Sequence, residues 1–118
     1  MSLKKQYRDL ILASKKQDSI PFTMGEMELA FKRPTRKDRR EIMALSKAED
    51  GSIDHAQFET WTAIKLTTVA STGETLFDEV DFNTIENLEI GSKFDELCAE
   101  AVLAMLGGLN DPKELPES

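Results

Sequence analysis

The sequence predicts a mainly α fold with one β-hairpin, of the α+β class, with about four to five helices. The chain has 118 residues and is 40% hydrophobic, which suffices for one domain with a modest core. Apolar residues recur at helical spacing in several segments, and two short alternating runs flank a Gly-Glu pair. We predict a single helical domain over residues 1–108, with the hairpin at about 20–33, followed by an acidic tail at 109–118 that we expect to be disordered.

The first element is an amphipathic helix, predicted over residues 3–16. Tyr7, Leu10, Ile11 and Ser14 follow helical spacing, while lysine and glutamine occupy most of the polar positions. The apolar stripe is therefore narrow. We expect the helix to end before Pro21, since a residue that precedes proline is disfavoured in the α conformation.

The hairpin is the clearest local signal. Two alternating runs at 20–24 and 27–31 are separated by Gly25-Glu26, and a two-residue Gly-X loop suits a type II′ turn. This register pairs Met24 with Met27, Phe22 with Leu29, and Ile20 with Phe31. All six side chains then share one face, and a one-residue slip would destroy the match. We expect this face to pack on helices or on another chain, because a lone hairpin is marginally stable.

Three helices follow, predicted at about 36–47, at about 55–70, and as a short helix that ends at Gly91. Each begins with a residue pair typical of helix N-termini, in which the first residue precedes the helix and the second lies three positions later. The pairs are Thr35 with Asp38, Asp54 with Gln57, and Asp78 with Asp81. Leu76 and Phe77 are two consecutive apolar residues between these helices, and we expect them to be irregular or extended.

The last helix has the most regular pattern. Ser92 and Asp95 are expected to cap its start, and Gly107-Gly108 to end it. Its apolar positions follow i, i+3, i+4, i+7, i+8 and i+11: Phe94, Leu97, Cys98, Ala101, Val102 and Met105. Cys98 is the only cysteine, so it cannot form an internal disulfide. Because it lies in this apolar helical pattern, we interpret it as an inert core residue and not as a reactive thiol.

Charge is divided unevenly along the chain. Residues 1–40 hold 11 Lys/Arg and 5 Asp/Glu, whereas residues 41–118 hold 4 Lys/Arg and 17 Asp/Glu. Two interpretations stay open: copies associate head-to-tail, or the two parts neutralise each other within one fold. The acidic balance disfavours nucleic acid and anionic membranes as partners. No apolar run approaches the roughly 20 residues of a membrane span, and no secretory signal is evident, so we expect a cytoplasmic protein.

The sequence offers no catalytic, cofactor or metal constellation, and we expect a protein that is not an enzyme. His55 is the only histidine, and one Cys with one His falls short of a usual zinc set. Residues 50–54, followed by Phe58, resemble the second half of an EF-hand loop. Ser46, Ala48 and Gln57 then occupy positions that need oxygen ligands or the bidentate glutamate. We interpret this segment as a turn followed by a helix cap.

A basic run precedes and enters the second predicted helix. Six of the nine residues 32–40 are basic, and positive charge in a first helical turn is unfavourable against the helix dipole. An acidic partner, a neighbouring subunit or simple solvation would offset this cost. Our hypothesis is a protein-binding cluster formed by Lys32, Arg33, Arg36, Arg39 and Arg40; the alternative is a solvated face. No aromatic residue interleaves the run, which disfavours nucleic-acid binding.

Taken together, three stretches resemble the phage tail assembly chaperones, small proteins encoded before the tape-measure protein of long-tailed phages and prophages. They are the hairpin running into the basic helix (22–40), the segment from Thr72-Gly73-Glu74 to Phe82, and the final helix closing on Leu106-Gly107-Gly108. The resemblance covers roughly residues 20–108 and rests on the order of elements.

The resemblance implies a non-enzymatic role in virion morphogenesis in the host cytoplasm. Members of this family bind the long helical tape-measure protein, keep it soluble, help to recruit tail-tube subunits, and are absent from the finished particle. Many are made in two lengths by ribosomal frameshifting, and this chain resembles the shorter form. We therefore expect the tape-measure protein as partner, possible contact with the tail-tube protein, and self-association. The alternative is a small regulatory or adaptor module with a degenerate EF-hand-like turn.

Overall fold

A computed structural model describes residues 2–13 and 19–107 of the chain. Within these ranges the fold is α+β, with five α-helices, one short 3-10 helix and a three-stranded antiparallel sheet, so the predicted fold class is confirmed. The elements in chain order are α1 (Leu3–Ala13), β1 (Ser19–Met24), β2 (Met27–Lys32), α2 (Arg36–Leu45), α3 (His55–Leu66), β3 (Thr67–Val69), η1 (Glu79–Asp81), α4 (Phe82–Glu86) and α5 (Lys93–Met105).

The hairpin forms in the predicted register, with Ile20 opposite Phe31, Phe22 opposite Leu29 and Met24 opposite Met27. Gly25 has a φ of 63°, and no described residue other than glycine has a positive φ. A positive φ at the first loop position alone is the geometry of a type II′ turn, which confirms that prediction. Burial of the shared face is graded: Phe31 is fully buried, Phe22 is partly buried, and Met27 at the loop is exposed.

A third strand corrects the predicted helix at 55–70. Helix α3 ends at Leu66, and Thr67–Val69 form β3, which pairs antiparallel with β2. Two causes act together: the run of β-branched residues favours an extended backbone, and β2 offers an unpaired edge. The Thr68 hydroxyl reinforces the pairing by donating a hydrogen bond to the carbonyl oxygen of Ala30 at 2.9 Å.

The predicted starts of the three longer helices α2, α3 and α5 are confirmed, and in two of them the predicted side-chain cap forms. Thr35 and Asp38 form a reciprocal capping box on α2, and the Asp54 carboxylate accepts a hydrogen bond from the Gln57 amide. Ser92 is the residue before α5, as predicted, but its hydroxyl does not cap the helix, because it has no hydrogen-bond partner. The Asp95 carboxylate accepts a hydrogen bond from the amide of Gly91, the residue before Ser92.

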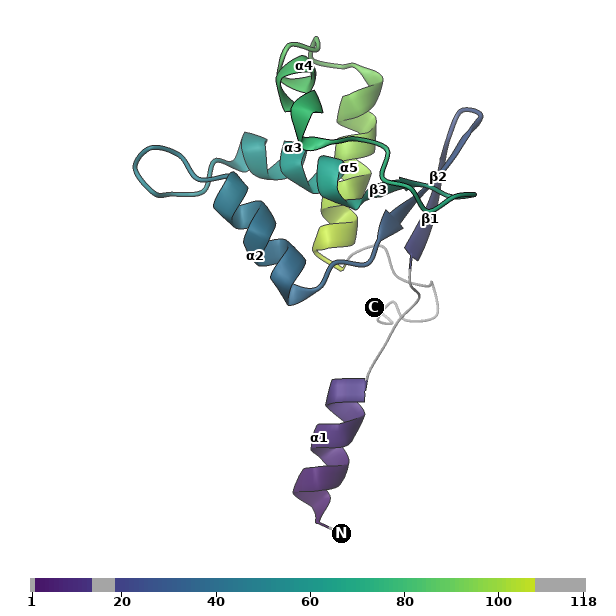
Figure 1. Ribbon diagram of the computed structural model, residues 1–118, viewed down its shortest axis with the longest axis vertical. Coiled ribbons are helices and arrows are strands. Elements are labelled where there is room, and N and C mark those ends of the chain that lie inside the picture. The colour runs from purple at the N-terminus through teal and green to yellow at the C-terminus, as the bar shows by residue number, and fades with distance from the viewer. Residues whose placement is uncertain (1, 14–18, 108–118) are drawn as a thin grey trace, which may run out of the picture.

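The core lies on both sides of α3, which packs against α5 and α2 (Figure 1). On one side, the buried face of the sheet meets α3 and α5 through Ile20, Leu29, Phe31, Ala63, Leu97 and Ala101. On the other side, α2 and α4 meet α3 through Ile42, Trp61, Ile64, Leu66 and Ile85. The short helix α4 packs against α3 through Phe82, whose ring stacks on Trp61 with centroids 4.6 Å apart and an interplanar angle of 9°.

Helix α1 stands apart from this core in Figure 1. None of its eleven residues is buried, so the predicted amphipathic stripe exists but does not contribute to the core. The last residues of the predicted first helix (14–16), Gly108 and the predicted tail (109–118) lie outside the described residues.

Candidate protein-binding site

Two concave surfaces adjoin the junction between α4 and α5. The first, which we name the apolar groove, has a volume of about 480 Å³. It runs between the loop end of the hairpin, the segment before η1, and the start of α5. Its apolar lining consists of Met24, Met27, Leu29, Leu76, Phe77, Ile85, Leu88, Phe94 and Leu97. Hydrophobic side chains that line an open groove are typical of a docking surface.

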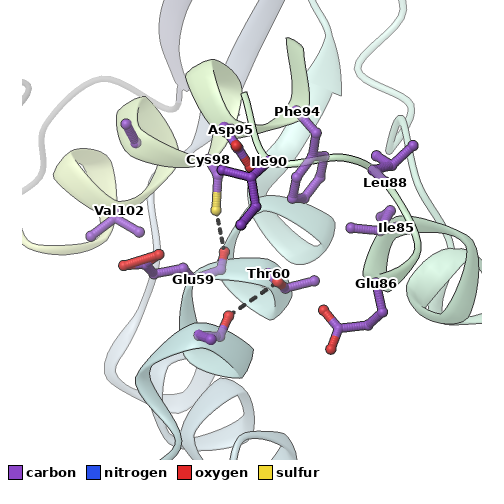
Figure 2. A pocket seen from close by; sticks show the side chains of 12 residues that line it. Glu59, Thr60, Ile85, Glu86, Leu88, Ile90, Phe94, Asp95, Cys98 and Val102 are labelled. Carbon is purple, nitrogen blue, oxygen red and sulfur yellow. Dashed lines mark hydrogen bonds between the residues drawn. The ribbon is translucent and has the colours of Figure 1, made fainter. Parts of the chain in front are cut away.

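The second surface, which we name the outer hollow, is drawn in Figure 2. It shares Ile85, Leu88 and Phe94 with the apolar groove. Its volume is about 420 Å³, and its floor comes from α3 and α5. Ile90, in the loop between α4 and α5, lines the hollow and is 99% exposed. A fully exposed isoleucine beside an open cavity favours contact with a partner.

The outer hollow has an acidic border. Glu59, Glu86 and Asp95 line it (Figure 2), and its lining, as far as the structure describes it, contains no lysine or arginine. The lining of the apolar groove includes one acidic residue, Asp81, and one basic residue, Lys93. An apolar floor with carboxylates at its edge suits an amphipathic helix that carries basic residues beside its apolar stripe.

Cys98 lies between α5 and α3 at the floor of the outer hollow. Its thiol donates a hydrogen bond to the Glu59 carbonyl oxygen at 3.0 Å (Figure 2). Burial, together with the nearby Glu59 and Asp95 carboxylates, raises the pKa of the Cys98 thiol to about 12. The thiol therefore stays protonated at neutral pH and is a poor nucleophile, in agreement with its interpretation as an inert core residue.

The five residues of the predicted basic cluster lie in three different environments. Three of them, Arg36, Arg39 and Arg40, are exposed and line a shallow hollow of about 310 Å³ beside Met43 on α2. Arg33 is half-buried, and its Nε has no hydrogen-bond partner. Lys32 extends toward α2, where its Nζ lies 3.4 Å from the Asp38 carboxylate.

Asp38 accounts for how α2 tolerates a basic first turn. Its carboxylate accepts a hydrogen bond from the Thr35 amide at 2.9 Å and places negative charge at the positive end of the helix dipole. Burial by itself raises the pKa of Asp38, but the Thr35 hydrogen bonds and the Lys32 charge outweigh it, so the pKa lies below its ordinary value. Asp38 therefore offsets part of the cost of the basic residues near the start of α2.

The EF-hand-like segment forms a turn and a cap, as interpreted. The Asp50 carboxylate accepts two hydrogen bonds from Ser52, one from its amide at 2.9 Å and one from its hydroxyl at 2.6 Å. These two bonds lower the pKa of Asp50. The Asp54 carboxylate caps α3 by accepting a hydrogen bond from the Gln57 amide. Nowhere in residues 2–13 and 19–107 do three or more His, Cys, Asp or Glu side chains gather as a metal site would require.

Neither concave surface follows from the sequence pattern. The short helix predicted to end at Gly91 would include Leu88, but α4 ends at Glu86, and both Leu88 and Ile90 are exposed. One signal was available: Leu76, Leu88 and Ile90 lie outside regular helical stripes, in the segment 74–90, which has six carboxylates and no basic residue. Apolar residues scattered in an acidic, irregular segment indicate a surface and not a core.

Scans against protein-family models, curated proteins and solved structures find no match to the chain. Over the part of the chain that the structure describes, no helix has the length and apolar character that crossing a membrane requires.

Proposed function

We propose that this protein is a phage tail assembly chaperone that binds the helical tape-measure protein in the host cytoplasm and acts without catalysis. The observation that carries the proposal is the outer hollow, in which the exposed Ile90 stands beside an apolar floor bordered by Glu59, Glu86 and Asp95. A helical client places an apolar stripe into such a site and keeps its polar face in water.

The stretches that carry the family resemblance bear on this site. The segment 72–82 leads into α4, and the final helix α5 forms part of the floor of the outer hollow. The apolar groove adds a second apolar surface, which shares Leu88 with the outer hollow. A chaperone that holds a long client needs exposed apolar contacts of this kind, each weak enough to be released when the tail tube assembles.

The three exposed arginines of α2 supply a second contact in this proposal. Arg36, Arg39 and Arg40 present guanidinium groups at the surface, and guanidinium pairs with carboxylate in a bidentate manner. Acidic groups on the client, on the tail-tube protein or on a neighbouring subunit are suitable partners. Lys32 and Arg33 are less available, because one is paired with Asp38 and the other is half-buried.

Co-production with the tape-measure protein of the same phage or prophage tests the proposal. We expect the tape-measure protein to be largely insoluble alone and to become soluble, and to co-purify, when this chain is produced with it. An equal insoluble fraction with and without this chain would contradict the proposal. The alternative, a regulatory module with an EF-hand-like turn, predicts a calcium-dependent change in Trp61 fluorescence; no observation on the turn at 50–54 favours it.

A further inference from the structure

Helix α1 carries an apolar stripe that the fold leaves in solvent. Leu3, Tyr7 and Ile11 are spaced i, i+4 and i+8, so they line one side of the helix, and each is more than half exposed: 62%, 59% and 71%. A helix of eleven residues is marginal in water without packing, because its nucleation is unfavourable. A surface that covers the stripe would therefore also stabilise the helix.

The basic residues of α1 lie beside this stripe. Lys4 and Arg8 are spaced i, i+4 and follow its Ile11 edge around the helix. Neither side chain forms an ion pair in the part of the chain that the structure describes, whereas the Lys5 ammonium is paired with Asp9 at 3.0 Å. Helix α1 is thus an amphipathic helix with two cationic side chains at one border of its apolar stripe.

The outer hollow has the complementary character. Its lining joins apolar side chains, among them the exposed Ile90, to the carboxylates of Glu59, Glu86 and Asp95 (Figure 2). All charges that line it, as far as the structure describes it, are negative, whereas the apolar groove is lined by one charge of each sign. A lining of a single sign selects a basic helix over a neutral or acidic one, because opposite charges attract and like charges repel.

The chain is long enough for α1 to reach the outer hollow of its own molecule. Ile20, near the start of β1, belongs to the same buried cluster as Cys98 and Ala101 of α5, and Cys98 also lines the hollow. The start of β1 and the hollow therefore lie on neighbouring sides of α5, about one helix width of 10–12 Å apart. The six Cα steps from Ala13 to Ser19 span up to about 21 Å. A second copy is not needed to bring this helix and the hollow together.

We infer that α1 folds back onto its own chain and seats the Leu3-Tyr7-Ile11 stripe in the outer hollow, with its two basic residues toward the carboxylates of the border. This contact covers the stripe and Ile90 together, with the gain that burial of apolar area brings. The arrangement in Figure 1, with α1 apart from the core, is then the open state. Because the outer hollow is also the proposed client site, the docked helix competes with the client; this consequence rests on the proposed function, whereas the docking itself does not.

Amide hydrogen exchange on the full chain, without any client, tests the docking with matched variants. We expect the α1 amides of the parent to be protected, and Ile11→Asp, which puts a charge into the stripe, to make them exchange about tenfold faster, which corresponds to about 1.4 kcal/mol. Leu12→Asp is the control, because Leu12 is also exposed (67%) but lies on the opposite side of α1, so this variant should stay protected.

A second pair of variants tests the hollow itself. Ile90→Asp should make the α1 amides exchange as fast as they do in Ile11→Asp. Val80→Asp, at a residue that is 83% exposed and does not line the hollow, should leave the protection of α1 unchanged. Because α1 buries no residue, the α1 variants should retain the melting temperature of the core.

Dilution separates the chain's own helix from the helix of a second copy. Docking within one chain gives a protection of α1 that does not depend on protein concentration, whereas protection that disappears on dilution would overturn the inference. Equal exchange rates of α1 in the parent and in Ile11→Asp would also overturn it, as would full protection in Ile90→Asp. No client is present in these measurements, so a parent that protects α1 but fails to keep the client soluble would retain this inference and contradict the proposed function.

Discussion

Lys32 places its ammonium nitrogen 3.4 Å from the Asp38 carboxylate, which joins the end of β2 to the first turn of α2 and puts an acid inside the basic cluster. The same carboxylate caps α2 through the Thr35 amide. We therefore expect Asp38→Ala to lower the free energy of unfolding by about 1–2 kcal/mol, as measured by chemical denaturation at pH 7. Asp38→Asn retains an acceptor for the Thr35 amide and should cost less.

The contribution of Asp38 should depend on pH. Because its pKa is lower in the folded chain than in the unfolded chain, the stabilisation is present above the ordinary Asp pKa of about 3.9 and is lost as the pH falls through that value and below. The difference in stability between the parent and Asp38→Ala should therefore shrink at acidic pH. A difference that is constant from pH 7 to pH 3 would contradict the role assigned to its charge.

The exposed arginines of α2 should matter for binding and not for folding. Reversing Arg36 and Arg40 to glutamate should weaken client binding or self-association, while monomer stability stays equal or rises slightly, because negative charge suits the first helical turn. Lys37→Glu is the control, since Lys37 does not line the hollow that Arg36, Arg39 and Arg40 share. If the double variant solubilises the client and associates like the parent, these arginines form only a solvated surface.

The hairpin should be sensitive to truncation in proportion to burial. Phe31 is fully buried, so Phe31→Ala should cost about 3–5 kcal/mol. Phe22, which stacks on Phe31 with centroids 5.4 Å apart, is only partly buried, and Phe22→Ala should cost about 1–2 kcal/mol. Thermal denaturation of both variants measures the difference. Equal melting temperatures for the two variants would contradict the graded burial of this face.

The Cys98 thiol should be slow to react in the folded chain. Because its pKa is raised to about 12, the thiolate is scarce at pH 8, and the side chain is also buried. We expect alkylation to be many-fold slower in buffer than in denaturant, as followed by mass spectrometry. The folded chain should also lose stability as the pH rises from about 9 toward 12, because only the unfolded thiol ionises freely in that range. Rapid alkylation of the folded chain would contradict the assigned burial.

Local patterns were sufficient for the elements whose causes are local. The register of the hairpin followed from alternation and from Gly25-Glu26, and the start of α2 followed from Thr35 and Asp38, because each depends on residues a few positions apart. Strand β3 was missed because three residues carry little pattern. Thr67–Val69 are extended because β2 supplies hydrogen bonds from a distant part of the chain.

The candidate site was less predictable than the fold. The basic run is visible in the sequence, but the pairing of Lys32 with Asp38 and the half-burial of Arg33 depend on how β2 meets α2. The outer hollow and the apolar groove combine side chains from the hairpin, α3, α4 and α5. No periodicity within one segment could place Ile90 beside Cys98 and Glu59.

The measurement that tests the proposed function most directly compares two exposed apolar residues in a client-solubility assay. Ile90→Asp puts a charge into the outer hollow, whereas Val80→Asp makes a similar change at a residue that is 83% exposed and lines neither concave surface. Both variants should fold like the parent, because neither side chain is buried. We predict that Ile90→Asp loses most of its ability to keep the tape-measure protein soluble, while Val80→Asp retains it. Equal solubilisation by the parent and both variants would contradict client binding at the outer hollow.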